Sequence, residues 1–320
     1  MKKTIQDHHY LIIAGTTKAA STSLYSFLAD HPHVIASDPK ETRFFLDSDY
    51  PLYARFHLSD GIDKYDTFFR DTSINQEALR MESSPQYLYG QNSAENIASS
   101  LPNVKLIFIL REPIARLLSY YGFAIQQGEL DSSLSIDDYI DIQLNRPALT
   151  GHSVDAMNAL QQGCYSQYLS RYLDLFPSGQ ILIINFEYLT QSPLKMMEII
   201  CSFARLNPDF YQDYKFSVYN PTHSPRFPKM NRFYRQFARS VSNQLYQLPL
   251  FWNPLRQCFR QSQSFMQYFG KQPAKKPKLS EPLREAVTRF YEPESTKLAN
   301  IFQHSSHHWS GSNAFSYWIN

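Results

Sequence analysis

The chain has 320 residues, of which 43% are hydrophobic and 19% charged, and its formal net charge is +2. This apolar content is ample for the core of one large domain or of two smaller ones. Three scattered cysteines without a CxxC or Cys/His spacing argue against a disulfide framework or a zinc site. No apolar run approaches the roughly 18 residues of a membrane-spanning helix, and MKKTIQDHHY leads into the first strand without an apolar leader, so we expect a cytoplasmic protein.

Apolar strands alternate with amphipathic helices along the chain. We expect strands at 10–16, 33–36, 79–83, 104–110 and 180–186. We expect helices at 21–30, 92–100, 113–127, 135–142, 163–176, 193–205 and 281–303. This order predicts an α/β fold with a P-loop-like parallel sheet that is flanked by helices. Ligands of such sheets bind at the carboxyl ends of the strands.

The first strand leads into a turn with one lysine and then into a helix that begins with hydroxyl residues, LIIAGTTKAASTSLYSFL. Amides at a helix N-terminus attract anions, and Lys18 adds a full positive charge. The segment therefore indicates a phosphate site, although a cluster of serine and threonine is also an ordinary helix cap. The lysine precedes the hydroxyl cluster, whereas the ATP-type P-loop places it after the loop glycines, so no Walker motif is present.

A second candidate phosphate site follows another apolar strand, in VKLIFILREPIARLLSYY at 104–121. Arg111 stands at the carboxyl end of the strand, and Pro113 suits the first turn of the next helix. Ser119 lies about two helical turns further on. Arg111 and Ser119 could clamp a phosphate together, and the alternative is that Arg111 is a surface ion-pair partner.

The two segments together resemble the nucleotide-binding motifs of sulfotransferases that use 3′-phosphoadenosine 5′-phosphosulfate (PAPS). The resemblance implies that the loop holds the 5′-phosphosulfate and that Arg111 and Ser119 hold the 3′-phosphate. The loop residues are Gly15, Thr16, Thr17, Lys18, Ala19, Ala20, Ser21, Thr22 and Ser23. The family prefers glycine at the position of Ala20.

HPHVIASDPKETRFF, at 31–45, resembles the segment after the first helix of heparan-type and related bacterial sulfotransferases. The resemblance implies that Glu41 is the general base that takes the acceptor proton. Lys40 either holds a sulfuryl oxygen or lowers the pKa of Glu41. Histidine is the base in the cytosolic small-molecule branch, so His31 and His33 are alternatives, although His31 suits an ordered turn before proline.

Later segments keep the order of the family, namely MESSPQYLY at 81–89, the stretch 163–193 and the helix at 283–302, with Trp309 near the usual final tryptophan. Ser83 stands where the heparan 3-O-type branch has a lysine, and the cysteine-bearing loop of that branch is absent. Arg226 and Lys229, in NPTHSPRFPKMNRF, are further candidates for contact with the cofactor phosphate.

A basic segment lies between the stretch 163–193 and the helix at 283–302. Between Asp213 and Glu281 there are 12 lysines and arginines and no acidic residue, so the rest of the chain holds all 29 acidic residues. The best explanation of this charge distribution is that the segment attracts an anionic acceptor or the cofactor. The second explanation is contact with an anionic membrane surface, and the third is that the segment has no specific role. Binding of nucleic acid ranks last. We expect 271–280 to be a mobile basic linker, because its prolines disfavour regular structure.

We therefore predict a single sulfotransferase domain over 1–320, with an α/β core of 1–213 and 281–310 and a basic, aromatic-rich helical insertion at 214–280. The predicted enzyme moves a sulfuryl group from PAPS to a hydroxyl or amine of a carbohydrate, glycolipid or other small hydroxylated acceptor. It needs no metal and releases 3′,5′-adenosine bisphosphate. The alternatives are a non-catalytic nucleotide-binding or interaction protein, and a P-loop kinase, for which Glu82 is the only candidate magnesium ligand.

Overall fold

The computed structural model describes residues 8–69, 78–146, 156–217, 223–225, 271–273, 277–304 and 308–309. The described residues do not include Arg226, Lys229 or most of the basic segment 214–280. The predicted helices of this segment, and its predicted contact with cofactor, acceptor or membrane, therefore fall outside the described residues. Within the described residues, no helix is long and apolar enough to cross a membrane.

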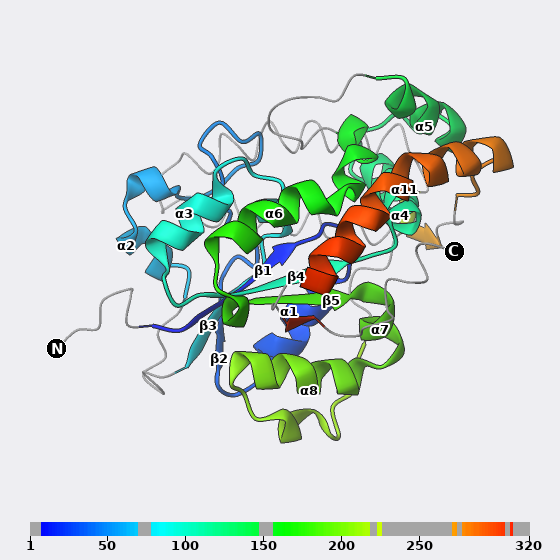
Figure 1. Cartoon of the computed structure of the whole chain (residues 1–320). Helices are drawn as coiled ribbons and strands as arrows, with labels where there is room; N and C mark the ends of the chain where they lie inside the picture. The colour runs from blue at the N-terminus through cyan, green and yellow to red at the C-terminus, as the bar shows by residue number, and fades with distance from the viewer. Residues whose placement is uncertain are drawn as a thin grey trace.

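A parallel sheet of six strands forms the centre of the described structure, in the order β2-β3-β1-β4-β5-β8 (Figure 1). The strands are β1 (Tyr10–Gly15), β2 (Val34–Ala36), β3 (Leu79–Glu82), β4 (Lys105–Leu110), β5 (Ile181–Asn185) and β8 (His308–Trp309). The chain proceeds from β1 to β2 and β3 on one side and then to β4 and β5 on the other. The strand order therefore reverses between β1 and β4, and this is where open α/β sheets bind ligands.

Helices cover both faces of the sheet (Figure 1). Ile12 packs on the side of α3 (Ser93–Ser100), α6 (Tyr165–Leu175) and α11 (Glu281–His304). Ile13, the next residue, packs on the side of α1 (Ser21–Ala29) and α8 (Pro193–Ala204), because successive side chains of a strand point to opposite faces. All six residues of β1 are buried, as expected for a strand covered on both sides.

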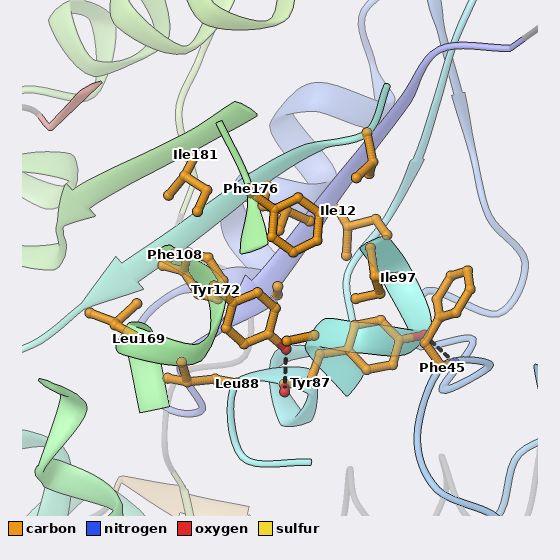
Figure 2. Packing of buried hydrophobic residues seen from close by; sticks show 14 of the residues in the cluster. Ile12, Phe45, Tyr87, Leu88, Ile97, Phe108, Leu169, Tyr172, Phe176 and Ile181 are labelled. Atoms are coloured by element: carbon orange, nitrogen blue, oxygen red, sulfur yellow. Dashed lines mark hydrogen bonds between the residues drawn. The ribbon is translucent and has the colours of Figure 1, made fainter. Parts of the chain in front are cut away.

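Figure 2 shows part of the first face, where Ile12, Phe108 and Ile181 of the sheet meet Tyr172 and Phe176. A separate apolar cluster joins α11 to α4 (Pro113–Gln126) and α5 (Ile136–Leu144). The shorter helices are η2 (Leu58–Asp60), α2 (Asp63–Asp66), η3 (Pro85–Leu88), η4 (Ala156–Asn158), η5 (Gln161–Gly163), η6 (Ser178–Gln180), α7 (Phe186–Gln191) and η7 (Pro208–Tyr211). The predicted parallel sheet between helices is confirmed.

The expected strands and helices end within two residues of the observed ones, but helix α7 and strand β7 (Lys271–Pro273) were not predicted. The strand expected at 180–186 ends at Asn185, because the Asn185 side chain accepts a hydrogen bond of 2.8 Å from the amide of Tyr188 and begins α7. The expected linker at 271–280 starts instead with β7, which pairs antiparallel with β6 (His223–Pro225). Each proline is the last residue of its strand in this two-stranded sheet, and such edge positions tolerate proline.

Candidate active site

The loop after β1 is shaped by a close approach of its backbone to neighbouring side chains. A Cβ atom on Gly15 would lie 2.9 Å from Cβ of Leu88 and 3.1 Å from Cδ1 of Phe108, so only glycine fits there. The amide of Thr16 donates to the carbonyl of Ile109 at 2.9 Å, which ties the loop to β4. The switch point between β1 and β4 is therefore closely packed beneath the loop.

Hydrogen-bond donors gather where this loop enters α1. The first turn of α1 contains no acidic residue, so the partial positive charge of its amides is not neutralised locally. Ser21 and Ser23 are buried and Thr22 is half-buried. The hydroxyl oxygen of Thr17 is buried without a hydrogen-bond partner in the described structure. Such an orphaned hydroxyl next to a helix N-terminus suits a phosphate oxygen.

Ala20 adopts a left-handed conformation (φ 61°) at the start of α1, where glycine has no steric penalty. We expect Ala20→Gly to raise the free energy of unfolding by about 1 kcal/mol, because the strain of a left-handed alanine is of this size. Urea unfolding monitored by circular dichroism measures the change. The matched control is Ala19→Gly, at a buried position without a positive φ, which should destabilise the protein. Destabilisation by both substitutions would contradict the prediction.

The side chain of Lys18 lies over an aromatic ring instead of a carboxylate. Its Nζ is 4.4 Å from the centre of the Phe123 ring on α4. Burial, with a smaller contribution from Arg111, lowers the pKa of Lys18 to about 8. Among the described residues no carboxylate forms an ion pair with it. A desolvated cation without a counter-ion suits an anionic ligand.

Arg111 joins the two candidate phosphate segments. Its Nη1 donates to the carbonyl of Lys18 at 2.9 Å, and its guanidinium lies 4.4 Å from the centre of the Phe186 ring. Tyr165 fixes the backbone at this point by donating to the Arg111 carbonyl at 2.8 Å. Nε of Arg111 is buried without a hydrogen-bond partner in the described part of the chain, so no protein acceptor there occupies this donor. Burial lowers the pKa of Arg111, with Glu187 acting in the opposite direction.

The helix that follows Arg111 starts with a strong cap. The carboxylate of Glu112 accepts the amide of Ile114 at 2.8 Å, and Pro113 occupies the first turn as predicted. Ser119 is half-buried on α4, six residues after Pro113 and so about 9 Å along the helix axis. Strand β6, which ends at Pro225, lies against the same helix.

Glu41 lies after β2 in a cluster of polar side chains. Its Oε2 accepts from Nη2 of Arg43 at 2.7 Å and from Nε2 of Gln86 at 3.2 Å, and its Oε1 lies 3.4 Å from Nζ of Lys40. Burial by itself would raise the pKa of Glu41, but Lys40 and Arg43 outweigh it and the pKa is lowered. The carboxylate is therefore ionised at neutral pH. Burial in turn lowers the pKa of Lys40, against the opposing effect of Glu41.

The short helix η3 connects this cluster with the loop after β1. Gln86 of η3 donates to Glu41, while Leu88 of the same helix packs against Gly15. Tyr89, the next residue, shares a hydrogen bond with the hydroxyl of Thr16. The two candidate halves of the site are thus attached to one rigid turn. Sequence reasoning missed the contributions of Arg43, Gln86 and the rings of Phe123 and Phe186, although Arg43 stands only two positions from Glu41.

The two histidines considered as bases lie at the far end of α1. His31 is buried, its Nε2 is 3.2 Å from the carbonyl of Asn207, and its Nδ1 accepts the amide of His33 at 3.2 Å. Both ring nitrogens are therefore engaged in a turn. His33 is exposed. Within the described residues, neither histidine shares a hydrogen bond with the loop after β1.

Glu82, the candidate magnesium ligand of a kinase, is fully buried and accepts hydrogen bonds from four hydroxyl groups. Its oxygens are thus occupied by protein donors. In the part of the chain that the structure describes, no group of three histidine, cysteine, aspartate or glutamate side chains could hold a metal ion.

Comparison with known proteins relates the chain to one family. A family model described as the sulfotransferase domain matches residues 8–298. Bifunctional heparan sulfate N-deacetylase/N-sulfotransferase 2 of Bos taurus is 30% identical over 214 residues, which are 65% of this chain and 23% of that protein. Bifunctional heparan sulfate N-deacetylase/N-sulfotransferase 3 of Homo sapiens is 27% identical over 209 residues, which are 65% of this chain and 24% of that protein. The match thus spans about a quarter of the length of these curated relatives.

Among solved structures, the chain resembles a sulfotransferase from Alicyclobacillus acidocaldarius, with a TM-score of 0.64. The superposition covers 97% of this chain and 98% of that chain at 18% sequence identity. At this identity the likeness concerns the fold, and it agrees with the parallel sheet described above.

Proposed function

This chain belongs to the sulfotransferase family, and from that premise we propose that it transfers a sulfuryl group from PAPS to a hydroxyl or amine of a carbohydrate-containing acceptor. Carbohydrate is favoured because the bovine and human relatives are named for heparan sulfate. Their names refer to N-sulfotransfer, so an amino sugar is the first acceptor to test, followed by hydroxyl acceptors including glycolipids.

The bond of 2.9 Å between Arg111 and the Lys18 carbonyl carries this proposal, because it brings the cations after β1 and β4 to one edge of the sheet. A ligand with phosphate groups at two positions matches two such cations. In the proposal, residues Gly15–Ser23 hold the 5′-phosphosulfate of PAPS. Arg111 and Ser119 hold the 3′-phosphate. Within the described residues, the Lys18 ammonium has no ion-pair partner, and the Thr17 hydroxyl and Nε of Arg111 have no hydrogen-bond partner, which fits a nucleotide with these groups.

Bound PAPS supplies an activated sulfuryl group whose transfer leaves charge on the oxygen between sulfur and phosphorus. Lys18 neutralises that charge, and the amides at the start of α1 assist it. Glu41 accepts the proton of the attacking hydroxyl or amine. Lys40, at 3.4 Å from Glu41, holds a sulfuryl oxygen or keeps the carboxylate ionised. Positioning and charge stabilisation account for most of the rate, as in phosphoryl transfer.

Calorimetric titration with 3′,5′-adenosine bisphosphate, AMP and ATP tests the nucleotide half of the proposal. Tight binding of the bisphosphate alone is the expected result, and transfer of labelled sulfuryl from PAPS to N-deacetylated heparosan or to unmodified heparosan then separates amine from hydroxyl acceptors. No binding, or equal binding of the three nucleotides, would favour a non-catalytic protein that retains the fold.

Arg111→Ala should weaken binding of 3′,5′-adenosine bisphosphate by about 10- to 100-fold, because a hydrogen bond to a charged group contributes about 1.5–3 kcal/mol. Binding of AMP, which lacks the 3′-phosphate, should change much less. The control is Arg289→Ala, which removes an exposed cation from α11. Calorimetry on all three proteins gives the comparison. Equal losses for both nucleotides would make Arg111 a structural residue.

A further inference from the structure

Glu82, the last residue of β3, is a fully buried carboxylate within a ring of donors. Its Oε2 accepts the hydroxyls of Thr42 at 2.8 Å and Ser84 at 2.7 Å, and the amide of Thr42 at 3.4 Å. Its Oε1 accepts the hydroxyls of Tyr65 at 2.9 Å and Tyr87 at 3.0 Å. A buried carboxylate is costly unless its oxygens are hydrogen-bonded, so this ring has a structural or functional purpose.

The ring fastens the segment that contains Lys40 and Glu41 to the end of β3. Thr42 directly follows Glu41 and contributes both its amide and its hydroxyl to Glu82. On either side of Thr42 the backbone is held as well. The Lys40 carbonyl accepts the amide of Ser83 at 3.0 Å, and the amide of Arg43 donates to the Ser84 hydroxyl at 3.1 Å.

The far end of the segment is fixed by the same ring. The amide of Phe45 donates to the hydroxyl of Tyr87 at 3.3 Å, and Figure 2 shows this contact together with the bond from Tyr172 to the Tyr87 carbonyl. Tyr87 itself packs within the core on the α6 side of the sheet. The segment 40–45 is therefore tied to the rigid core through Glu82 and Tyr87.

We propose that Glu82 is a positioning residue for the acceptor half of the site, which fixes Lys40 and Glu41 by holding Thr42. Glu82 is sealed from any substrate by its five hydrogen bonds, so it acts only through Thr42 and its neighbours. The inference rests on the proposed role of Glu41 as general base. A shift of about 1 Å in a reacting group can cost about 100-fold in rate, and this gives Glu82 a measurable effect.

Thr42→Val and Tyr65→Phe form a matched pair for the test. Each removes one hydroxyl donor to Glu82 and keeps the shape of the side chain. Only Thr42 belongs to the segment with Glu41, where its hydroxyl also contacts the Phe44 amide and the Tyr87 hydroxyl. We expect Thr42→Val to lower kcat by about 10- to 100-fold with the KM for PAPS unchanged, Tyr65→Phe to leave kcat within about twofold, and Thr42→Ser to restore the rate. The assay uses labelled PAPS with N-deacetylated heparosan.

Amide hydrogen exchange followed by mass spectrometry gives a readout that needs no acceptor. Thr42→Val should speed exchange within residues 40–45 and leave the loop 15–23 unchanged, whereas Tyr65→Phe should not affect 40–45. Equal effects of the two variants, or unchanged exchange in Thr42→Val, would overturn the positioning role. Failure of the wild-type protein to bind 3′,5′-adenosine bisphosphate would instead refute the proposed function, and hydrogen exchange would still decide whether Glu82 fixes the segment.

Discussion

Lys18→Ala is expected to reduce sulfuryl transfer by about 10²- to 10³-fold, the usual loss when one group that stabilises the transition state is removed. The fold should survive, because among the described residues Lys18 has no ion-pair partner and its Nζ lies over the Phe123 ring. Burial of an unpaired cation is unfavourable, so its removal should not lower the melting temperature. Transfer from labelled PAPS and thermal unfolding measure the two effects. Near-normal turnover would remove the role assigned to Lys18.

The lowered pKa of Lys18 adds a pH signature to this prediction. Only the protonated lysine can neutralise developing negative charge, so kcat/KM for PAPS should fall as pH rises above about 8, the pKa of Lys18 in the free protein. A bound anionic nucleotide should raise the pKa of Lys18, so kcat should fall at a higher pH than kcat/KM does. Lys18→Arg keeps its charge and should lose this alkaline limb. An unchanged limb in Lys18→Arg would assign it to another group.

Glu41→Gln is expected to lower kcat by about 10²-fold or more, which is typical of the loss of a general base. Glutamine can still accept from Arg43 and Gln86, so the segment should keep its position and the affinity for 3′,5′-adenosine bisphosphate should stay the same. Because Lys40 and Arg43 lower the pKa of Glu41, the wild-type acid limb from this group should lie below the ordinary pKa of a glutamate, 4.5.

The control for this prediction is Glu95→Gln, which neutralises an exposed carboxylate on α3 and should leave the rate unchanged. Calorimetry and single-turnover transfer from labelled PAPS separate binding from chemistry in both variants. A Glu41→Gln protein that retains the wild-type rate would transfer the general-base role to another group, whereas a loss of nucleotide affinity would make Glu41 part of the nucleotide site.

The parallel sheet and most of its helices could be predicted because their signals are local. The apolar runs of β1 (YLIIAG) and β4 (KLIFIL) predict strands that are covered on both faces, and the structure buries them in this way. The start of α4 could also be predicted, since Pro113 comes soon after the strand and suits the first turn of a helix. The start of α7 was missed although Asn185 is an ordinary capping residue, because the apolar run that precedes it favoured a longer strand.

The sequence named candidate site residues but not their arrangement. By themselves, the motifs around Lys18, Glu41 and Arg111 and their order along the chain identified a phosphate-binding α/β protein similar to sulfotransferases. Only the tertiary structure decided that Arg111 bonds to the Lys18 carbonyl, that η3 joins the two halves and that Glu82 is sealed instead of open to a metal. Most of these contacts join residues about 40 to 90 positions apart, and contacts at such separations leave no periodic pattern in a single sequence, because packing against the sheet creates them.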